Sequence, residues 1–132
     1  MIQVAPDWSD LERFRFGDGP ELADALLALV LLGTKTATCW SFADGQQTAV
    51  GKRMVACDSR DRPRAVIETI RLDVCLFGEV TGAFAAKEGE DDRSLTSWRR
   101  AHQAYFERNG GFDPEMPLWC EEFKLIAEIA IP

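Results

Sequence analysis

Three strand-like segments follow one another within the first 75 residues of this chain, with no helical pattern between them. Residues 36–42 are rich in β-branched and aromatic side chains, and residues 54–58 and 65–75 have a similar character. A fourth segment of this kind covers residues 119–126. Parallel strands need a long, usually helical, crossover between them, so this order predicts an α+β fold around an antiparallel or mixed sheet. Such a sheet could close into a small mixed β-barrel.

Helical patterns flank these strands. Pro20 favours a helix start, and apolar residues at helical spacing predict a helix over residues 20–32, with Gly33 just beyond its end. Between the third and fourth strands we expect a short helical stretch near residues 78–87 and a longer helix near residues 94–108. The predicted order is therefore helix, three strands, two helices, strand.

Length and composition suit one folded domain over residues 1–132. The chain has 132 residues, of which 46% are hydrophobic, and this is an ordinary balance for a globular protein with a single core. The longest apolar stretch, residues 22–32, is interrupted by Asp24 and is too short to span a bilayer, so no membrane partner is expected. Residues 1–10 lack the pattern of a secretory signal, and the expected location is the cytoplasm.

The cysteines are expected to be free thiols. They are spread along the chain without a C-x-x-C pair, and there is a single histidine, His102, to assist in binding a metal. The sequence therefore predicts neither a metal site nor a cofactor. The four cysteines are Cys39, Cys57, Cys75 and Cys120.

The formal net charge of -7 disfavours extended contact with a nucleic-acid backbone. Two segments nevertheless carry a local basic excess: residues 51–71 hold six basic and three acidic side chains, and residues 93–108 hold four basic and one acidic. One interpretation is a solvated mixture of surface charge. The other is a restricted basic site, in which Lys35 and at least two of four arginines surround one concavity. Those arginines are Arg53, Arg64, Arg93 and Arg99.

The segment from Gly33 to Thr38 lies where the first predicted helix passes into the first predicted strand. Glycine lets the backbone turn, and Lys35 then stands beside the negative end of the helix. A lysine in this place could bind phosphate or a base carbonyl. Alternatively, Lys35 is only a favourable charge at a helix end, and the threonines only satisfy strand propensity.

These residues match the pattern G-x-K-x-x-T, and the chain resembles the small stand-alone bacterial proteins of the ASCH family over nearly its full length. The resemblance implies a β-barrel related to PUA domains, with a cleft that accepts RNA or a nucleotide-like ligand. The matching residues are Phe16-Gly17-Asp18, Lys35-Thr36-Ala37-Thr38, Glu68-Thr69, Lys87-Glu88-Gly89-Glu90, Asp91-Asp92-Arg93-Ser94-Leu95, Trp98-Arg99 and Met116-Pro117.

The resemblance also implies candidate activities. Some small members of the family are amidohydrolases that remove an acyl group from the exocyclic amine of cytidine with a lysine, a threonine and a glutamate. By motif position these roles fall on Lys35, Thr38 and Glu88. Other members are ribonucleases or non-catalytic RNA-binding modules, so the implied partner is a nucleoside, a nucleotide or single-stranded RNA.

The chemistry of this set is coherent. A threonine hydroxyl needs a base to take its proton as it attacks an amide carbonyl, and Lys35 could be that base if it is neutral. Glu88 could orient Lys35 or pass a proton to the leaving amine. Lys35 and Thr38 would point to opposite faces of a regular strand, so they can meet only if Lys35 lies in the preceding turn. Alternatively, Glu88 belongs to a solvated acidic loop.

Three further residues are candidates for ligand binding. Arg93 could pair with phosphate, Trp98 could stack on a base, and Ser41 could line the same cleft. Trp98 also lies on the apolar face of its predicted helix, which favours a place in the core. A serine-histidine-acid triad that uses His102 is not expected, because nothing around it resembles a nucleophile turn.

Overall fold

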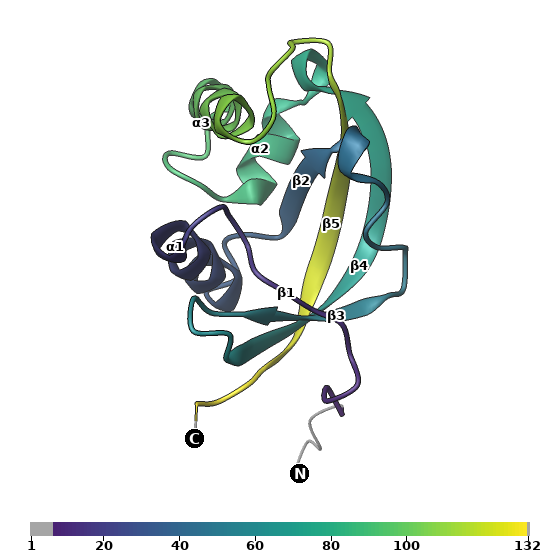
Figure 1. The fold of residues 1–132 in the computed structure, drawn as a ribbon, viewed down its shortest axis with the longest axis vertical. Coiled ribbons are helices and arrows are strands. Elements are labelled where there is room, and N and C mark those ends of the chain that lie inside the picture. The colour runs from purple at the N-terminus through teal and green to yellow at the C-terminus, as the bar shows by residue number, and fades with distance from the viewer. Residues whose placement is uncertain (1–6, 132) are drawn as a thin grey trace.

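The computed structural model describes residues 7–131 as a curved five-stranded sheet with three α-helices packed against it (Figure 1). The strand order is β1-β3-β4-β5-β2; β1 pairs with β3 in parallel, and the other three pairings are antiparallel. The elements are β1 (Arg13–Phe14), α1 (Pro20–Leu31), β2 (Ala37–Ser41), β3 (Arg53–Cys57), β4 (Pro63–Leu76), α2 (Gly82–Glu88), α3 (Leu95–Arg108) and β5 (Pro117–Glu128), with short 3-10 helices at Phe42–Asp44 and Phe77–Glu79.

The long strands β4 and β5 form the centre of the sheet. The register between them shifts at Val66/Ile67 and again at Thr69/Arg71. Such irregularities increase local twist and bend a strand, which is consistent with the curvature of β4 in Figure 1. The curvature brings α1 near one end of the sheet and α2 and α3 near the other.

Two apolar clusters anchor these helices. The first holds α1 against β3, β4 and β5, and the second packs α2 and α3 against the other end of the sheet. Burial of such side chains contributes about 1.5–3 kcal/mol each to the stability of the fold, and this packing fixes the position of each helix against the sheet. The first cluster includes Phe16, Leu26, Leu27, Val30, Ile67 and Phe123, and the second includes Phe77, Val80, Ala85, Trp98, Phe106 and Leu118.

The predicted α+β class and antiparallel core of the sheet are confirmed, but closure into a barrel is not. Within residues 7–131 no ladder joins the two edge strands β1 and β2. β1 is only two residues long and β2 only five, and their ladders are to β3 and β5. The sheet therefore stays open along a seam between β1 and β2.

Most predicted elements are found within a few residues of their expected limits. The stretch expected near residues 78–87 is two elements, because Thr81 caps a new helix by accepting a hydrogen bond from the Phe84 N–H. The short strand β1 was not predicted. All four cysteines are free, as expected. None of the helices in the described part of the chain is long and apolar enough to cross a membrane.

Candidate functional site

Lys35 lies in the turn between α1 and β2. Gly33 has a φ of 82°, in the left-handed region that glycine adopts without strain, and the backbone N–H groups of Thr34 and Lys35 both donate to the Leu29 carbonyl at 3.0 and 3.1 Å. β2 begins only at Ala37. Lys35 therefore precedes the strand, as is required if its side chain is to lie on the same side as that of Thr38.

The ammonium of Lys35 is enclosed by oxygen atoms. Its Nζ lies 3.1 Å from Glu88 Oε1, 3.3 Å from the Glu88 carbonyl and 3.4 Å from Glu90 Oε2, and the side chain is 1% exposed. Burial by itself would lower the pKa of Lys35, but the two carboxylates outweigh it and raise that pKa above its ordinary value. Three N–H donors face three acceptors, so Lys35 is held as an ammonium.

Glu88 is the centre of this group. The side chain is 1% exposed, and its Oε2 accepts a hydrogen bond of 2.5 Å from Trp98 Nε1 and lies 3.3 Å from His102 Nε2. Burial would raise the pKa of Glu88, but Lys35, His102 and the Trp98 N–H lower it to about 2. Both carboxylate oxygens are thus occupied, and Glu88 is ionised at neutral pH. We call Lys35, Glu88, Glu90, Trp98 and His102 the charged cluster.

His102 completes the charged cluster from α3. Its Nδ1 lies 2.9 Å from the Trp98 carbonyl, its Nε2 faces the Glu88 carboxylate, and its ring stacks on Trp98 with centroids 4.2 Å apart. Both ring nitrogens face an oxygen acceptor, a carbonyl and a carboxylate, and this favours the doubly protonated ring. Burial would lower the pKa of His102, but Glu88 raises it above the ordinary value. Nothing in the sequence indicated this role for His102.

Gly89 allows the acidic loop to close over Lys35. Its φ is 75°, and a Cβ at this position would lie 2.6 Å from the Thr34 carbonyl oxygen. The Thr36 N–H also donates to the Lys87 carbonyl at 2.7 Å, which fixes the end of α2 beside the start of β2. The backbone approach places Glu88 and Glu90 around the same ammonium.

A metal does not fit the charged cluster well. Cys39, Glu88 and His102 offer three donor atoms within 4.8 Å of one another. However, the Glu88 carboxylate is already shared between the Lys35 ammonium and two N–H donors. Burial and the nearby Glu88 raise the pKa of the Cys39 thiol well above its ordinary value, which disfavours the thiolate that a metal would need. A cation would have to displace Lys35.

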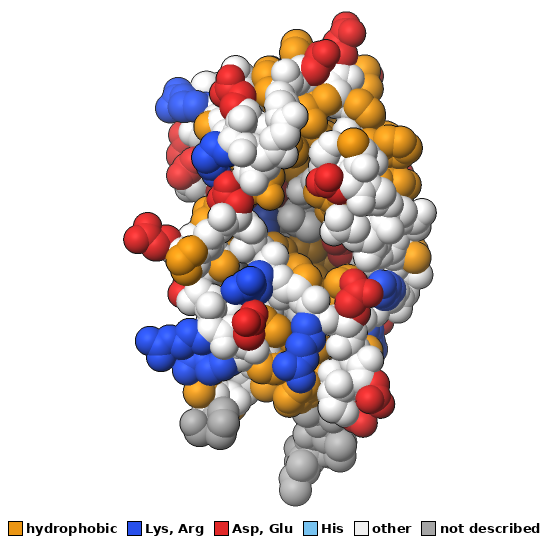
Figure 2. Space-filling view, viewed as in Figure 1, with side chains coloured by type: hydrophobic (Ala, Val, Ile, Leu, Met, Phe, Trp, Pro, Cys, Tyr) orange, Lys and Arg blue, Asp and Glu red, His pale blue; other side chains and the backbone are white. Residues whose placement is uncertain are grey.

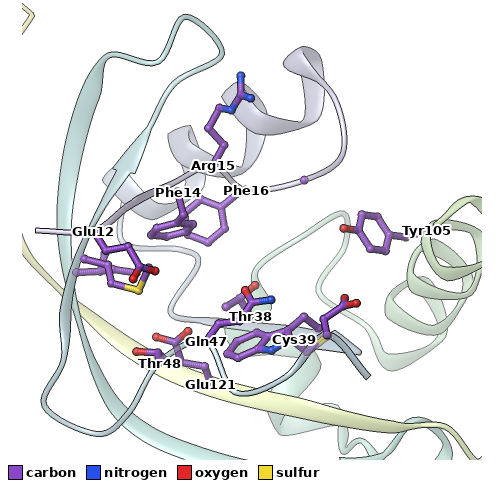
Figure 3. A pocket seen from close by; sticks show the side chains of 15 residues that line it. Glu12, Phe14, Arg15, Phe16, Thr38, Cys39, Gln47, Thr48, Tyr105 and Glu121 are labelled. Carbon is purple, nitrogen blue, oxygen red and sulfur yellow. The ribbon is translucent and has the colours of Figure 1, made fainter. Parts of the chain in front are cut away.

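The cavity beside the charged cluster has two adjoining hollows. One has a volume of about 250 Å³ and the other about 240 Å³, and the open face of the molecule is indented where they lie (Figure 2). The first includes Lys35, Thr38 and Glu88, so the three predicted catalytic residues share one hollow. The second lies along the seam, with walls from β1 and β2 (Figure 3). Both hollows include Phe16, Gly17, Thr38, Cys39 and Tyr105.

Thr38 lies on β2 at the junction of the two hollows. Among residues 7–131 its hydroxyl makes no hydrogen bond to another group, so it is available to a ligand. The residue directly opposite on β5 is Glu121, which is 6% exposed and also lines the second hollow. Sequence reasoning missed Glu121. The available signal was a carboxyl on the same strand face as Trp119 and Phe123.

Glu121 is held by two threonines. Its Oε2 accepts a hydrogen bond of 2.6 Å from Thr69 Oγ1, which lies 2.7 Å from Thr48 Oγ1. Because Thr69 gives its proton to Glu121, Thr48 must be the donor in the second bond. Burial raises the pKa of Glu121, while the Thr69 hydrogen bond and Lys35 oppose this only in part.

A family model of the ASCH domain matches residues 12–127. The chain belongs to the ASCH domain family. Two solved structures are similar to it. One is the ASCH domain from Lactobacillus crispatus JV V101, with 29% identity, a TM-score of 0.82, and coverage of 90% of this chain and 81% of that one. The other is protein EF3133 from Enterococcus faecalis V583, with 28% identity, a TM-score of 0.79, and coverage of 89% and 77%. No curated protein matches the sequence.

The remaining predicted ligand-binding residues of this ASCH domain lie outside the cavity. Ser41 accepts a hydrogen bond from the Ala43 N–H and starts the 3-10 helix after β2. Arg93 is exposed and donates to the Ala86 carbonyl at 3.1 Å, so it braces the loop before α3. Trp98 is buried and directs its N–H to Glu88, so its ring supports the charged cluster and is not free to stack on a base.

The expected basic cleft of this ASCH domain was wrong. Arg53 pairs with Glu68, Arg64 binds the Ile129 carbonyl, and Arg99 binds the Gly78 carbonyl. None of these three, nor Arg93, lines either hollow. The cavity instead has Arg15 and Arg108 at its edges. Apart from Arg108, the basic residues of the two segments lie on strands and helix faces that point elsewhere, which a local count of charge does not reveal.

Proposed function

We propose that this ASCH domain is a hydrolase that cleaves the amide bond of a small neutral ligand, with an acylated cytidine as the expected substrate. The observation that carries this proposal is the shared hollow of Lys35, Thr38 and Glu88, which are the three residues that the family motif assigns to amide hydrolysis. A hollow of about 250 Å³, joined to a second of similar size, suits a nucleoside better than a polymer.

The charge around the cavity favours a nucleoside over a nucleotide or RNA. Acidic side chains outnumber basic ones in its lining, and basic and acidic groups alternate around the hollow in Figure 2 without a continuous basic track among the described residues. A phosphate would meet repulsion here. The acidic lining residues are Glu12, Asp44, Glu88, Glu90 and Glu121, and the basic ones are Arg15, Lys35 and Arg108.

In the proposed reaction the free hydroxyl of Thr38 attacks the acyl carbon. The carbonyl oxygen gains negative charge in this step, and the Lys35 ammonium is the group that would stabilise it. Glu90 is its most weakly held acceptor, at 3.4 Å and with 21% of its side chain exposed, so it can give up its place to the substrate. Glu88 would act as a positioning residue. Because Lys35 already carries its proton, it is an electrostatic group in this mechanism and not the base.

The test offers purified protein an acylated cytidine, the same compound with a 5′-phosphate, and a short single-stranded RNA. We expect turnover of the nucleoside and weaker turnover of its phosphate. Thr38→Val should lower kcat about a hundredfold or more while thermal unfolding stays unchanged. Thr36→Val is the matched control, because the Thr36 hydroxyl has only a long contact of 3.5 Å to the Lys87 carbonyl.

The same experiment distinguishes the hydrolase from a non-catalytic module that only binds a nucleoside. Lys35 is saturated by three acceptors, which is also compatible with a group that only binds. Nucleoside binding that weakens in Lys35→Ala, without turnover by the wild type, would replace the hydrolase with a binding module. Lys124→Ala serves as the control for the loss of a lysine, since Lys124 is exposed and pairs with Glu68. Cleavage of the RNA would support the ribonuclease instead.

A further inference from the structure

The proposed attack by Thr38 lacks a base, since Lys35 is already protonated and both oxygens of Glu88 are occupied. We infer that Glu121 is a second catalytic carboxyl of this site, which takes the proton of Thr38 and returns it to the leaving amine. The inference rests on the proposed function and adds to it a residue outside the family motif. It depends on the register of β2 against β5, on the free oxygen of Glu121 and on the shared hollow.

The register places the two side chains together. Thr38 and Glu121 are Cα partners in the antiparallel pairing of β2 with β5. Directly opposed residues point to the same face of a sheet, with Cβ atoms about 4.5–5.5 Å apart. Both line the seam hollow, and Figure 3 displays them on its floor with Thr48. A substrate amide seated over Thr38 would therefore lie beside the Glu121 carboxyl.

Glu121 has an oxygen to spare. Among residues 7–131, Thr69 is the one hydrogen-bond donor to Glu121 and it binds Oε2, and no atom of Glu121 is among the buried polar atoms without a partner. Its other oxygen is therefore accessible from the hollow. The Thr48 to Thr69 to Glu121 chain fixes the carboxyl in place while leaving this oxygen free.

The surroundings of Glu121 favour its protonated form more than water does. Burial raises its pKa, which strengthens it as a base relative to an ordinary glutamate. Titratable or charged groups from four parts of the chain line the cavity around it. These are Lys35 from the turn before β2, Glu12 and Arg15 beside β1, Asp44 after β2, and Tyr105 from α3.

The proton balance closes over two steps. A bond forms between Thr38 Oγ and the acyl carbon as the hydroxyl proton passes to the Glu121 carboxylate. The C–N bond then breaks, and Glu121 gives that proton to the amine nitrogen, leaving an acyl ester on Thr38. Water attacks this ester with its proton passing to Glu121. That proton returns to Thr38 Oγ as the ester bond breaks, which releases a carboxylic acid and restores the site.

The experiment measures kcat and KM for an acylated cytidine against pH in the full chain. For Glu121→Gln we expect kcat to fall about a hundredfold or more, with KM little changed and the low-pH decline of the wild-type rate lost. Glu122→Gln is the matched control. Glu122 follows Glu121 on β5, faces the other side and pairs with Lys87 at 2.7 Å, so its replacement should leave the rate unchanged.

Thr69→Val gives a second readout that a structural role would not produce. The Thr69 hydrogen bond lowers the pKa of Glu121, so its removal should move the low-pH decline of the rate to higher pH while activity persists.

Two results would overturn the inference alone: a Glu121→Gln enzyme with the wild-type rate and pH profile, or one whose only loss is in KM. If the wild type cleaves no acylated nucleoside, the proposed function and the inference fail together.

Discussion

Glu88 and Glu121 are both buried carboxyl side chains beside the same cavity, yet their surroundings act on them in opposite directions. Glu88 has a lysine, a histidine and an indole N–H against it, and its pKa falls to about 2. Glu121 has only a threonine hydroxyl, and burial raises its pKa. The degree of burial is nearly the same in the two residues. The donors around each carboxyl therefore decide whether it is a fixed charge or a proton carrier.

The charged cluster and the seam also differ in how many of their polar atoms already have a partner in the protein. The charged cluster is closed around Lys35 and Glu88, since among residues 7–131 the ammonium and both carboxylate oxygens all have partners. The seam beside it carries a free hydroxyl on Thr38 and a carboxyl with one free oxygen. Groups that must hold a geometry are thus separate from groups that can meet a ligand, as a site with a rigid support requires.

The largest expected effect comes from removing the cation of the charged cluster. Lys35→Met removes the lysine from the buried Glu88 carboxylate, and breaking such a buried pair costs about 3–5 kcal/mol. Urea unfolding of wild type and variant measures this loss of free energy. Lys124→Met should cost less than about 1 kcal/mol, because its pair with Glu68 is exposed. Equal losses in the two variants would contradict a closed cluster.

Trp98→Phe sharpens the comparison by removing one donor from Glu88. The 2.5 Å hydrogen bond is made to a charged group, so we expect unfolding to become easier by about 1.5–3 kcal/mol. Trp40→Phe removes a bond from Trp40 Nε1 to the Gly45 carbonyl, which lies at the surface, and should cost about 0.5–1.5 kcal/mol. The reverse order of the two losses would show that Glu88 does not depend on this indole.

Gly89→Ala tests the backbone that closes the cluster. The left-handed φ of 75° and the short approach to the Thr34 carbonyl both oppose a Cβ, and we expect a loss of about 1–3 kcal/mol. Gly82→Ala is the control, because nothing lies within 4 Å of its added Cβ and alanine favours a helix. Thermal unfolding of both variants, compared with wild type, measures the effect. Equal behaviour would mean that the acidic loop is not tightly seated.

The pH dependence of stability should differ in sign between the two carboxyls, and the smallest expected effect, that of Glu121, is found there. The folded pKa of Glu88 lies below its ordinary 4.5, so its contribution is present above that pH and is lost as the pH falls toward 2. The folded pKa of Glu121 lies above 4.5, so its contribution is full below that pH and is lost as the pH rises through the folded pKa.

Glu121→Gln should therefore be slightly more stable than wild type at neutral pH, by about 1 kcal/mol or less, and its stability should fall less as the pH rises above 4.5. Glu88→Gln should instead lose stability at neutral pH and remove the decline at acid pH. Unfolding by urea at several pH values separates the two. If the free energy of unfolding depended on pH in the same way in both variants, the proposed difference between Glu88 and Glu121 would be wrong.

The sequence predicted the elements whose patterns are long and regular. The helix expected at residues 20–32 is Pro20–Leu31, and the one expected at 94–108 is Leu95–Arg108, because apolar spacing and end residues act locally. β1 could not be foreseen, since two residues carry no periodicity. Barrel closure was expected from the family resemblance, and the short edge strands did not provide it.

The candidate site was only partly visible in the sequence. Lys35, Thr38 and Glu88 were predicted from the family resemblance. They share a hollow because the turn before β2 contacts the end of α2. His102 and Glu121 were missed, since their importance depends on which strand or helix faces them. The apolar spacing of its helix correctly indicated that Trp98 is buried. Its hydrogen bond to Glu88 depends on the tertiary fold and could not be predicted from the sequence. Arg93 and Ser41 lie near the motif in sequence and still point elsewhere.

Because the seam is open, a bound ligand could link the two edge strands of the sheet. In a closed barrel, backbone hydrogen bonds would join the first and last strands, whereas here β1 and β2 are free edges with the cavity between them. A ligand that touches Phe14 on one edge and Thr38 on the other would connect the two ends of the sheet. Its binding free energy would then restrain their relative motion and stabilise the fold as ligand concentration rises. Amide exchange would slow at both edges together, although no residue of β1 pairs with β2.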